Sequence, residues 1–362
     1  MQMSKEHVVE LLEEFDRLNG ISGFEDEVAK KLCERLAPFA PDQSVDRMGN
    51  CICIKKGKNP DFKIMLSAHM DEIGLMVHEI LDNGYIQFVP IGMHNPNMLV
   101  NQVMTIHTKK GKVFGVVGGG KPIHQEHNTN NTGFGFKDLR LDVGAVNQEE
   151  ARQMGIKIGD VINIEREPRL LNGSFFSGKA VDNRSGCVAM ILIMELLKDV
   201  ETEASIYCCG TTQEEVGIKG AKVVSRSVKP DIALALDVGI GAEDEKLNPN
   251  GTRTYLGKGP GIQMYDWNPS TFLGVIVPRK LTDALEDAAN KAGVIYQKQV
   301  VLSCGTDATE ISLSNDGVIT GGLAIPNRYI HTSIGVIHID DVIGVAKVAA
   351  EFIKDITAEF LC

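Results

Sequence analysis

The second half of the chain alternates between two kinds of apolar segment, and this alternation is the strongest constraint on the fold. Residues 181–200, 279–293 and 340–357 have the apolar spacing and composition of helices. Between them lie short runs that are mostly apolar, at residues 203–212, 231–239 and 317–326. Strands that are apolar throughout are typical of a sheet covered by helices. The sequence therefore predicts an α/β fold, with a mostly parallel sheet and helices on both faces.

The first 164 residues divide into two parts. Residues 1–72 fit the same pattern, since Ser4 can cap an amphipathic helix and the stretch KIMLSAHM forms a further strand. Residues 73–164 show no long helical period and contain two hairpin patterns, one with Asn-Gly at its turn. We predict a catalytic domain at 1–72 and 165–362, interrupted by a β-barrel-like domain at 73–164. A Gly-rich β insertion of this length is expected to pair with another surface.

Charge and composition exclude several classes of partner. The chain has 37 basic and 48 acidic residues, a formal charge of −11, which argues against nucleic acid and against an anionic membrane. The N-terminal segment is acidic and amphipathic, unlike a signal peptide, and no run of about 18 apolar residues occurs. The eight cysteines form no C-x-x-C pair and are expected to be reduced thiols. These features predict a cytoplasmic protein.

Polar residues gather where the predicted strands end. Carboxyl ends of parallel strands meet at one edge of an open α/β sheet, where binding sites lie. Each side chain alone has an ordinary explanation as a turn residue, helix cap or hydrogen-bonded core residue, but their shared position favours a common site. They are His69 and Asp71 after residues 63–68, Glu214 and Glu215 after 203–212, Asp237 in 231–239, His331 after 317–326, and Asp182 at the start of the 181–200 helix.

This donor set favours divalent metal. Two imidazoles and three carboxylates suit Zn²⁺, with Co²⁺ or Mn²⁺ as substitutes. Two ions that share one carboxylate keep positions open for water and substrate, and Asp182 is the expected shared ligand. Of Glu214 and Glu215, one is expected to bind metal and the other to act as general base, because neighbouring side chains in extended chain point to opposite sides. Asp71 is expected to orient the imidazole of His69.

Five segments resemble the signature segments of the glutamyl and tetrahedral aminopeptidase family, dinuclear-metal exopeptidases of which some carry an endoglucanase label. They are AHMDEIGLMV, GKAVDNRSG, TTQEEVGIKGA, ALDVG and GTDATEISLSNDGVITGGLAIPNRYIH, and they occur in the family's order. The resemblance extends from SGFEDEVA near the start to the last predicted helix. It implies a catalytic α/β domain interrupted by a β domain that mediates assembly into a homo-oligomer, usually a tetrahedral dodecamer.

The resemblance also implies a role for each site residue. His69, Asp182 and Asp237 match the ligands of one metal, and Asp182, Glu215 and His331 match those of the other. Glu214 matches the catalytic base and Asp71 the orienting carboxylate. The implied activity is removal of N-terminal residues from short peptides by a hydroxide that bridges two metal ions, with a glutamate as general base.

Two details limit what the resemblance implies about specificity and assembly. Thr309 and Glu310 stand where relatives often have glycine and another small residue, so a specificity pocket bordered by this loop would differ. His124, in the inserted segment, is either a residue that reaches an active site across a subunit contact or a solvated loop histidine.

Three other functions fit parts of this pattern. A metal-dependent deacylase of small acylated amines would use the same chemistry. An endoglucanase would need two carboxylates on either side of a sugar, whereas adjacent Glu214 and Glu215 face opposite ways and the histidines would have no purpose. A self-assembling scaffold could keep the metals for stability alone. Glu214→Gln separates catalysis from the scaffold, because only catalysis predicts lost turnover with retained metal.

Overall fold

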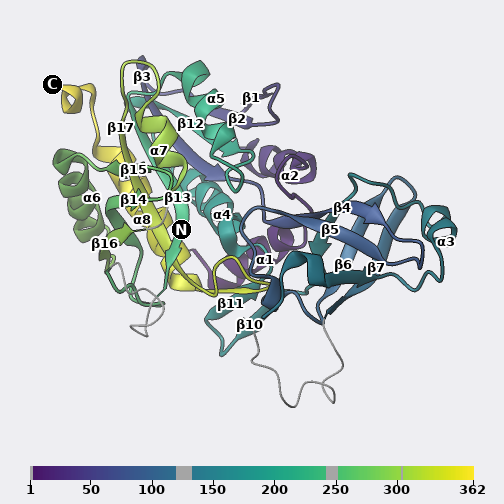
Figure 1. Cartoon of the computed structure of the whole chain (residues 1–362). Coiled ribbons are helices and arrows are strands. Elements are labelled where there is room, and N and C mark those ends of the chain that lie inside the picture. Colours follow the sequence, from purple (N-terminus) through teal and green to yellow (C-terminus); the bar gives the residue numbers. More distant parts are fainter. Residues whose placement is uncertain (1–2, 120–132, 242–251, 303–304) are drawn as a thin grey trace.

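The computed structural model describes residues 3–119, 133–241, 252–302 and 305–362. It consists of a large sheet flanked by helices and, to one side, a small barrel of strands (Figure 1). His124 lies outside the described residues, so its position stays open. Within the described ranges, no helix combines the length and the apolar character needed to cross a membrane.

The large sheet has twelve strands, and its four central strands run in one direction. The order is β1-β2-β12-β3-β13-β17-β18-β11-β10, with β14 beside β17 and β15 and β16 paired to β14. The neighbours β12–β3, β3–β13 and β13–β17 are parallel. The strand bounds are β1 Asp42–Val45, β2 Cys51–Lys55, β3 Asn59–His69, β10 Arg169–Leu171, β11 Phe175–Gly178, β12 Ala204–Thr211, β13 Ile232–Ile240, β14 Gly261–Asn268, β15 Leu273–Ile276, β16 Gln297–Leu302, β17 Ile319–Arg328 and β18 Gly335–His338.

The α/β prediction is confirmed, but the sheet as a whole is mixed rather than mostly parallel. Antiparallel pairs flank the parallel centre, including β1–β2, β2–β12, β17–β18 and β10–β11. The hairpins β1–β2, β10–β11 and β14–β15 cause this difference, because short connections join strands that run in opposite directions. The apolar runs that led to the prediction are the buried parallel strands at the centre.

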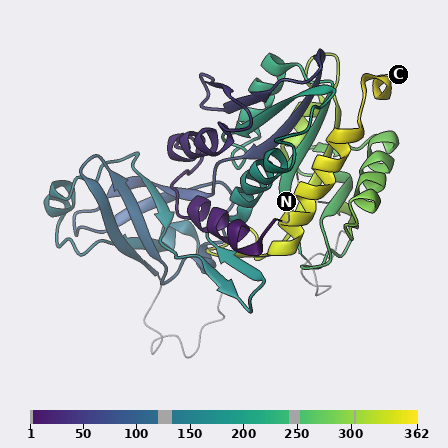
Figure 2. The same ribbon diagram turned by 180° about the vertical axis from the view of Figure 1, so that it is seen from behind.

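Helices pack on both faces of the sheet, and alternate residues of each central strand contact opposite layers. Ile64 and Leu66 of β3 join the core beneath α1, α2, α4, α6 and α8, while Met65 joins the core beneath α5 and α7. Figure 2 shows α8 running across the first of these faces. The helix bounds are α1 Lys5–Asp16, α2 Asp26–Leu36, α4 Val181–Leu196, α5 Lys219–Val228, α6 Arg279–Lys291, α7 Asp307–Ser312 and α8 Ile339–Asp355, with a final 3-10 turn η4 Ala358–Leu361.

The inserted segment forms a closed barrel with its own apolar core, as predicted. The strand order around the barrel is β4-β5-β8-β7-β6-β9, and its interior includes Phe88, Ile106 and Leu141. The two predicted hairpins are the pairs β4–β5 and β6–β7. The bounds are β4 Gly74–Ile80, β5 Ile86–Ile91, β6 Val103–Thr108, β7 Gly111–Gly119, β8 Leu139–Asp142, β9 Val161–Ile164, η1 Pro96–Met98, η3 Phe136–Asp138 and α3 Gln148–Gln153.

Both connections between sheet and barrel carry candidate site residues. On the way out, β3 ends at His69 and β4 begins at Gly74, so Asp71 lies in the short link between them. On the way back, the chain passes from β9 through the β10–β11 hairpin into α4, where Asp182 lies. The barrel is therefore attached directly beside the edge of the sheet where the sequence predicts a site.

Candidate metal centre

The sheet brings four of the five predicted metal ligands to one edge, and the start of α4 brings the fifth, Asp182. His69 is the last residue of β3, and its register partner Thr211 ends the adjacent parallel strand β12, three residues before Glu214. Asp237 lies within β13, and His331 follows the end of β17 by three residues. Since β12, β3, β13 and β17 are parallel, their carboxyl ends deliver these side chains to the same place.

The five predicted ligands form two candidate groups that share Asp182. His69, Asp182 and Asp237 offer ligand atoms that all lie within 4.8 Å of one another, and so do Asp182, Glu215 and His331. Asp182 Oδ1 lies 3.1 Å from Nε2 of His69, whereas its Oδ2 lies 3.5 Å from Nε2 of His331. The remaining members are close as well: Asp237 Oδ1 is 3.6 Å from Nε2 of His69, and Glu215 Oε2 is 3.2 Å from Nε2 of His331. One carboxylate thus presents a separate oxygen to each group.

Asp182 is held where the chain enters α4. Asp182 and Asn183 depart from helical backbone angles, and the peptide bond between them is cis. The side-chain amide of Asn183 donates to the carbonyl of Leu236 at 2.8 Å, which ties this segment to β13 next to Asp237. The predicted helix start is therefore present, but regular helical geometry begins only after Asn183.

A buried ion-pair network fixes the same segment from behind. Lys179 Nζ lies 2.5 Å from Oε1 of Glu72, and Arg184 Nη2 lies 3.3 Å from that same oxygen. The backbone N–H groups of Lys179 and Ala180 donate to the carboxylate of Asp16 at the end of α1. These contacts hold the backbone on both sides of Asp182, since Lys179 precedes it and Arg184 follows it.

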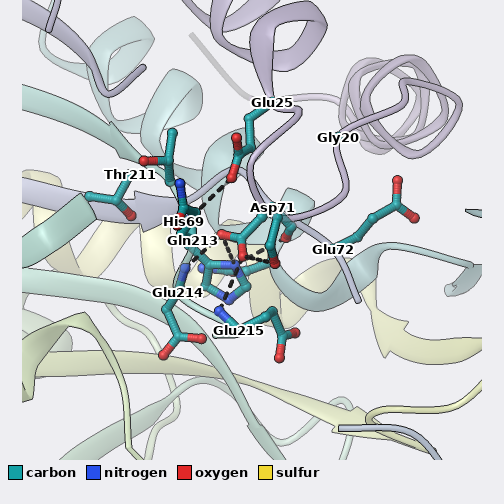
Figure 3. Close-up of polar contacts among 12 residues, drawn as sticks. Gly20, Glu25, His69, Asp71, Glu72, Thr211, Gln213, Glu214 and Glu215 are labelled. Carbon is teal, nitrogen blue, oxygen red and sulfur yellow. Dashed lines mark hydrogen bonds and ion pairs between the residues drawn. The ribbon is translucent and has the colours of Figure 1, made fainter. Parts of the chain in front are cut away.

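Asp71 does more than the sequence predicted. Its carboxylate accepts hydrogen bonds from the backbone N–H groups of Glu214 and Glu215, at 3.0 and 3.1 Å, and from the hydroxyl of Ser22 at 2.6 Å (Figure 3). Nδ1 of His69 lies 3.1 Å from the backbone carbonyl of Asp71 and 3.5 Å from its Oδ1. Burial opposes ionisation, but the contacts with His69, Ser22 and the Glu214 N–H keep the pKa of Asp71 below its usual range. Asp71 therefore positions both the His69 ring and the turn that carries the two glutamates.

Glu25 supports this turn from the other side. Its Oε1 accepts the backbone N–H of Gln213 at 3.0 Å and that of Gly23 at 2.7 Å (Figure 3). Gln213 has a positive φ of 55°, so the chain turns sharply there. Burial, with the nearby charge of Asp71, raises the pKa of Glu25 to about 7.

Glu214 and Glu215 diverge, although for a different reason than predicted. Strand β12 ends at Thr211, so both residues lie in the turn after the strand and not in extended chain. Their carboxylates point in different directions in Figure 3, and Glu215 contacts His331 while Glu214 belongs to neither ligand group. Burial and the charge of Glu215 raise the pKa of Glu214 well above its usual range. A carboxylate with a raised pKa beside a candidate ligand group is suited to accept a proton.

The site opens into a cavity of about 320 Å³. Both histidines and the acidic residues lie on its wall, and the described residues that line it include no lysine or arginine. The apolar part of the wall comes from Met93, Ile218, Val238, Ile240, Leu273 and Ile330. The cavity therefore combines a concentrated negative charge with an apolar surface.

The donors fit divalent cations. Burial raises the pKa of Asp237 and of Glu215, and the charge of Asp182 raises both further, because neighbouring carboxylates repel one another. Burial disfavours the charged ring of His331, but the hydrogen bond and charge of Glu215, together with Asp182, raise its pKa to about 9. In the absence of a cation, protons are thus the available counter-charge, and a divalent ion can replace them. Nitrogen and carboxylate donors of this kind match zinc and its neighbours in the first transition row.

Sequence reasoning missed several residues beneath and beside the site. Asp307, at the start of α7, accepts hydrogen bonds from Ser67 at 2.5 Å and Thr211 at 2.6 Å, and its pKa is raised by burial to about 6. Ser67 lies on β3, two residues before His69, and Thr211 ends β12, three residues before Glu214. Asp307 therefore joins the two strands close to the site. The one sign of Asp307 in the sequence was its place in the GTDATEI segment. The prediction made for that segment concerned Thr309 and Glu310 and did not include Asp307.

Those neighbours do not line the cavity. Thr309 is buried in α7, and Glu310 forms an ion pair with Lys222 at 3.1 Å. The cavity wall is formed here by Gly305 and Thr306. Thr309 and Glu310 therefore lie behind the pocket and do not form its wall.

Comparison with known proteins shows which family the chain belongs to. The family described as M42 glutamyl aminopeptidase matches residues 49–348. The lysyl aminopeptidase of Pyrococcus furiosus is 32% identical over 353 residues, which are 96% of this chain and 97% of the relative. The structure of an aminopeptidase from the archaeon Desulfurococcus kamchatkensis has a TM-score of 0.91 at 34% identity, covering 99% of this chain and 97% of that one.

A third match is the TET1 peptidase of Pyrococcus horikoshii, described as able to assemble into a tetrahedron or a large octahedral shell. It has a TM-score of 0.85 at 31% identity, covering 96% of this chain and all of that one. The family match covers most of the sequence, and the structural matches extend over both sheet and barrel. This chain belongs to the M42 glutamyl aminopeptidase family.

Proposed function

We propose that this protein is a metal-dependent aminopeptidase that removes N-terminal residues from short peptides. It holds two divalent cations per subunit, and Zn²⁺ is the expected metal. The observation that carries the proposal is the position of Asp182, whose two carboxylate oxygens face two different groups of ligands. His69 and Asp237 complete the first group, and Glu215 and His331 complete the second. When bound, two such cations lower the pKa of water towards about 7 and polarise the carbonyl of the scissile bond.

Residues of this chain supply the proton transfers and the orientation. Glu214 lines the cavity without joining a ligand group, so it is free to accept the proton of the attacking water and deliver it to the leaving amine. Burial raises its pKa above the usual range, which makes the carboxylate a stronger base. Asp71 fixes the Glu214–Glu215 turn through two backbone N–H groups and keeps the His69 ring oriented, so that base and ligands keep their relative positions.

The cavity wall supports a preference among N-terminal residues. The family name refers to glutamyl substrates and one relative is a lysyl aminopeptidase. Beyond the proposed ligands and Glu214, the described wall of this cavity is largely apolar, with Asn268, Thr271 and Thr306 as its polar side chains, and it contains no lysine or arginine to pair with a glutamyl side chain. We expect leucyl substrates to be cleaved faster than glutamyl or lysyl ones.

We also propose that residues 73–164 mediate assembly into a homo-oligomer, with a tetrahedral dodecamer as the expected form. The similarity to a TET1 peptidase that assembles into a tetrahedron or a shell supports this role. So does the outer surface of the barrel, where Val103, Phe114 and Val116 are exposed. Val103 and Val116 are direct cross-strand partners on β6 and β7, so these side chains form one patch.

A chelation experiment on the purified protein tests the proposal. Prolonged dialysis against a chelator should abolish hydrolysis of aminoacyl p-nitroanilides, and Zn²⁺ or Co²⁺ should restore it. The panel should contain leucyl, glutamyl and lysyl p-nitroanilides, together with N-acylated amines and carboxymethylcellulose. Activity that survives removal of the metal would contradict the proposal. Turnover of acylated amines alone would indicate a deacylase, and metal binding without any turnover would indicate a scaffold.

A further inference from the structure

Three cysteines converge at a place outside the metal centre. Cys33 comes from α2, and Cys51 and Cys53 come from β2. The Cys33 and Cys51 sulfurs lie 2.9 Å apart, those of Cys51 and Cys53 lie 3.6 Å apart, and those of Cys53 and Cys33 lie 3.9 Å apart. Cys51 and Cys53 are fully buried, while Cys33 is partly exposed at the edge of the cluster. The thiol cluster, defined as these three residues, is therefore accessible through Cys33.

The spacing favours a bond between two sulfurs over a shared metal ion. Thiolates that bind one zinc ion at about 2.3 Å in tetrahedral geometry lie about 3.8 Å from each other. The separation of the Cys33 and Cys51 sulfurs, 2.9 Å, is much shorter than that. The Cys53 sulfur lies farther away, 3.6 Å from that of Cys51 and 3.9 Å from that of Cys33. The surroundings point the same way, because the cluster lies in the apolar core that includes Leu32 and Leu36, where a disulfide stays neutral but a trithiolate does not.

The three thiols differ in reactivity. Hydrogen bonds from Cys51 and Cys53 stabilise the thiolate of Cys33 and lower its pKa to about 4, against the effect of burial. Hydrogen bonds with Cys33 and with Cys53, together with burial, raise the pKa of Cys51. Cys51 therefore keeps its proton. A partly exposed thiolate next to a buried thiol is the arrangement of a redox-active pair, in which the accessible sulfur reacts first.

We propose that the thiol cluster is a redox-active site in which Cys33 and Cys51 form a reversible disulfide by reaction with a small-molecule disulfide. The Cys33 thiolate attacks one sulfur of the small disulfide, forming a mixed disulfide and releasing one small thiolate. The released small thiolate takes the proton of Cys51, and the Cys51 thiolate then attacks the Cys33 sulfur, which forms the Cys33–Cys51 bond and releases the second small thiolate. The two protein sulfurs are oxidised, the small disulfide is reduced to two thiols, and Cys53 remains a thiol.

The new bond would join two elements that hold the catalytic turn. Helix α2 follows directly after Glu25, whose carboxylate accepts the N–H of Gln213. Strand β2 follows directly after Asn50, whose side-chain oxygen accepts the N–H of Thr212 at 3.0 Å. The site thus lies on the two supports of the turn at residues 212–215. The inference goes beyond the proposed peptidase activity and does not depend on it.

Oxidation of the full-length protein with glutathione disulfide tests the proposal. A Cys362→Ser background removes the thiol at the exposed C-terminal residue. Mass spectrometry of the non-reduced digest should show a Cys33–Cys51 cross-link, and the bond should raise the apparent Tm by about 4 °C, as expected for a cross-link that closes a loop of this length in a chain of this size. Dithiothreitol should reverse both changes.

Matched variants inside the cluster make the result specific. Cys33→Ser should abolish the cross-link and the Tm shift, whereas Cys53→Ser should retain both, because Cys53 is not a partner in the bond. Two results would overturn the proposal: three free thiols at positions 33, 51 and 53 after treatment, or a stoichiometric soft cation that is bound by the reduced protein and lost in Cys33→Ser.

Discussion

The edge of the central sheet and the interior of the barrel bury different kinds of side chain. At the sheet edge, His69, Asp71 and Asp237 are all buried. In the described part of the barrel the interior is apolar. Its buried polar side chains, Thr105 and Asn163, alternate with interior residues and so lie on the outer side, and neither carries a charge. Burying a charge is costly unless partners compensate it. The barrel therefore has the interior expected of a part that only needs to be stable, whereas the sheet edge retains charges that serve chemistry.

The two regions also differ in what their surfaces expose. The sheet edge meets solvent through a cavity lined by His69, His331 and Asp182, and the two oxygens of Asp182 lie 3.1 and 3.5 Å from Nε2 of those rings. The barrel exposes apolar side chains on β6 and β7. Charge concentrated inside a cavity indicates catalysis or ion binding, while an apolar outer face indicates contact with another protein surface. The following predictions test this division of roles.

The largest effect is expected from removing the shared ligand. Asp182→Ala should abolish detectable turnover and reduce bound metal from about two ions per chain to well below one, because both ligand groups lose a member. Metal analysis after dialysis measures this loss directly. Asp142→Ala, at an exposed position on β8 of the barrel, should keep both metal and activity. An Asp182→Ala protein that retains its metal would show that the two groups do not share this residue.

The next largest effect is expected at the proposed base. Glu214→Gln should lower kcat by about 10²–10⁴-fold, since a positioned general base contributes about that factor. Metal content should not change, because Glu214 belongs to neither ligand group. Glu79→Gln, on the exposed side of β4, provides the matched control and should leave kcat unchanged. Equal loss of metal and turnover in Glu214→Gln would instead make Glu214 a ligand.

Asp71→Asn should destabilise the protein more than a polar substitution in the barrel. The amide cannot replace both carboxylate oxygens as acceptors for Glu214, Glu215 and Ser22, so the free energy of unfolding should fall by about 3 kcal/mol. Asn163→Ala removes a buried amide that contacts His107 and Asn19 and should cost about 1 kcal/mol. Urea unfolding of both metal-free variants makes the comparison, and equal costs would remove the distinction between the two regions.

Glu25 should make stability depend on pH. Its pKa is about 7 in the folded chain against 4.5 ordinarily, so the folded state holds the proton more tightly. The resulting contribution to stability is fully present below pH 4.5 and is lost as the pH rises through about 7. Glu25→Gln keeps the acceptor oxygen and should raise the free energy of unfolding at pH 8 by about 2 kcal/mol relative to wild type. Urea unfolding of metal-free protein from pH 5 to 8 should show no such gain at pH 5.

The smallest effect on the single chain is expected at the barrel surface. Phe114→Ser with Val116→Ser should change chain stability by no more than about 0.5 kcal/mol per site, since both side chains are exposed. The mass in solution should nevertheless fall, because the apolar patch is lost. Val45 is exposed on β1, an edge strand of the large sheet, so Val45→Ser should leave the mass unchanged. An unchanged mass in the barrel variant would place the assembly surface elsewhere.

The features that depend on local pattern could be predicted from the sequence. Buried central strands read as continuous apolar runs, and a parallel arrangement then brings His69 and Asp237 to one edge. The barrel could be predicted from its hairpin patterns, which are local too. The mixed character of the sheet could not, because short flanking strands carry little information about which neighbour they pair with.

Contacts between distant segments were also out of reach. Asp71 accepts hydrogen bonds from the backbone N–H groups of Glu214 and Glu215, and Glu25 accepts one from that of Gln213. These contacts depend on the sharp turn at Gln213, which the residue types in that segment do not predict. The three cysteines of the thiol cluster looked like separate core thiols, because Cys33 is on a helix and the other two are on a strand. Only the packing of α2 against β2 brings them together.

The order of the proposed ligands along the chain has a consequence for protein synthesis. His69 is made early, but His331 is added only 262 residues later. A nascent chain on the ribosome, or a fragment truncated before the end of β17, therefore holds an incomplete second ligand group. Peptide cleavage would begin only after His331 has been added, so a chain still short of that residue could not attack other newly made polypeptides.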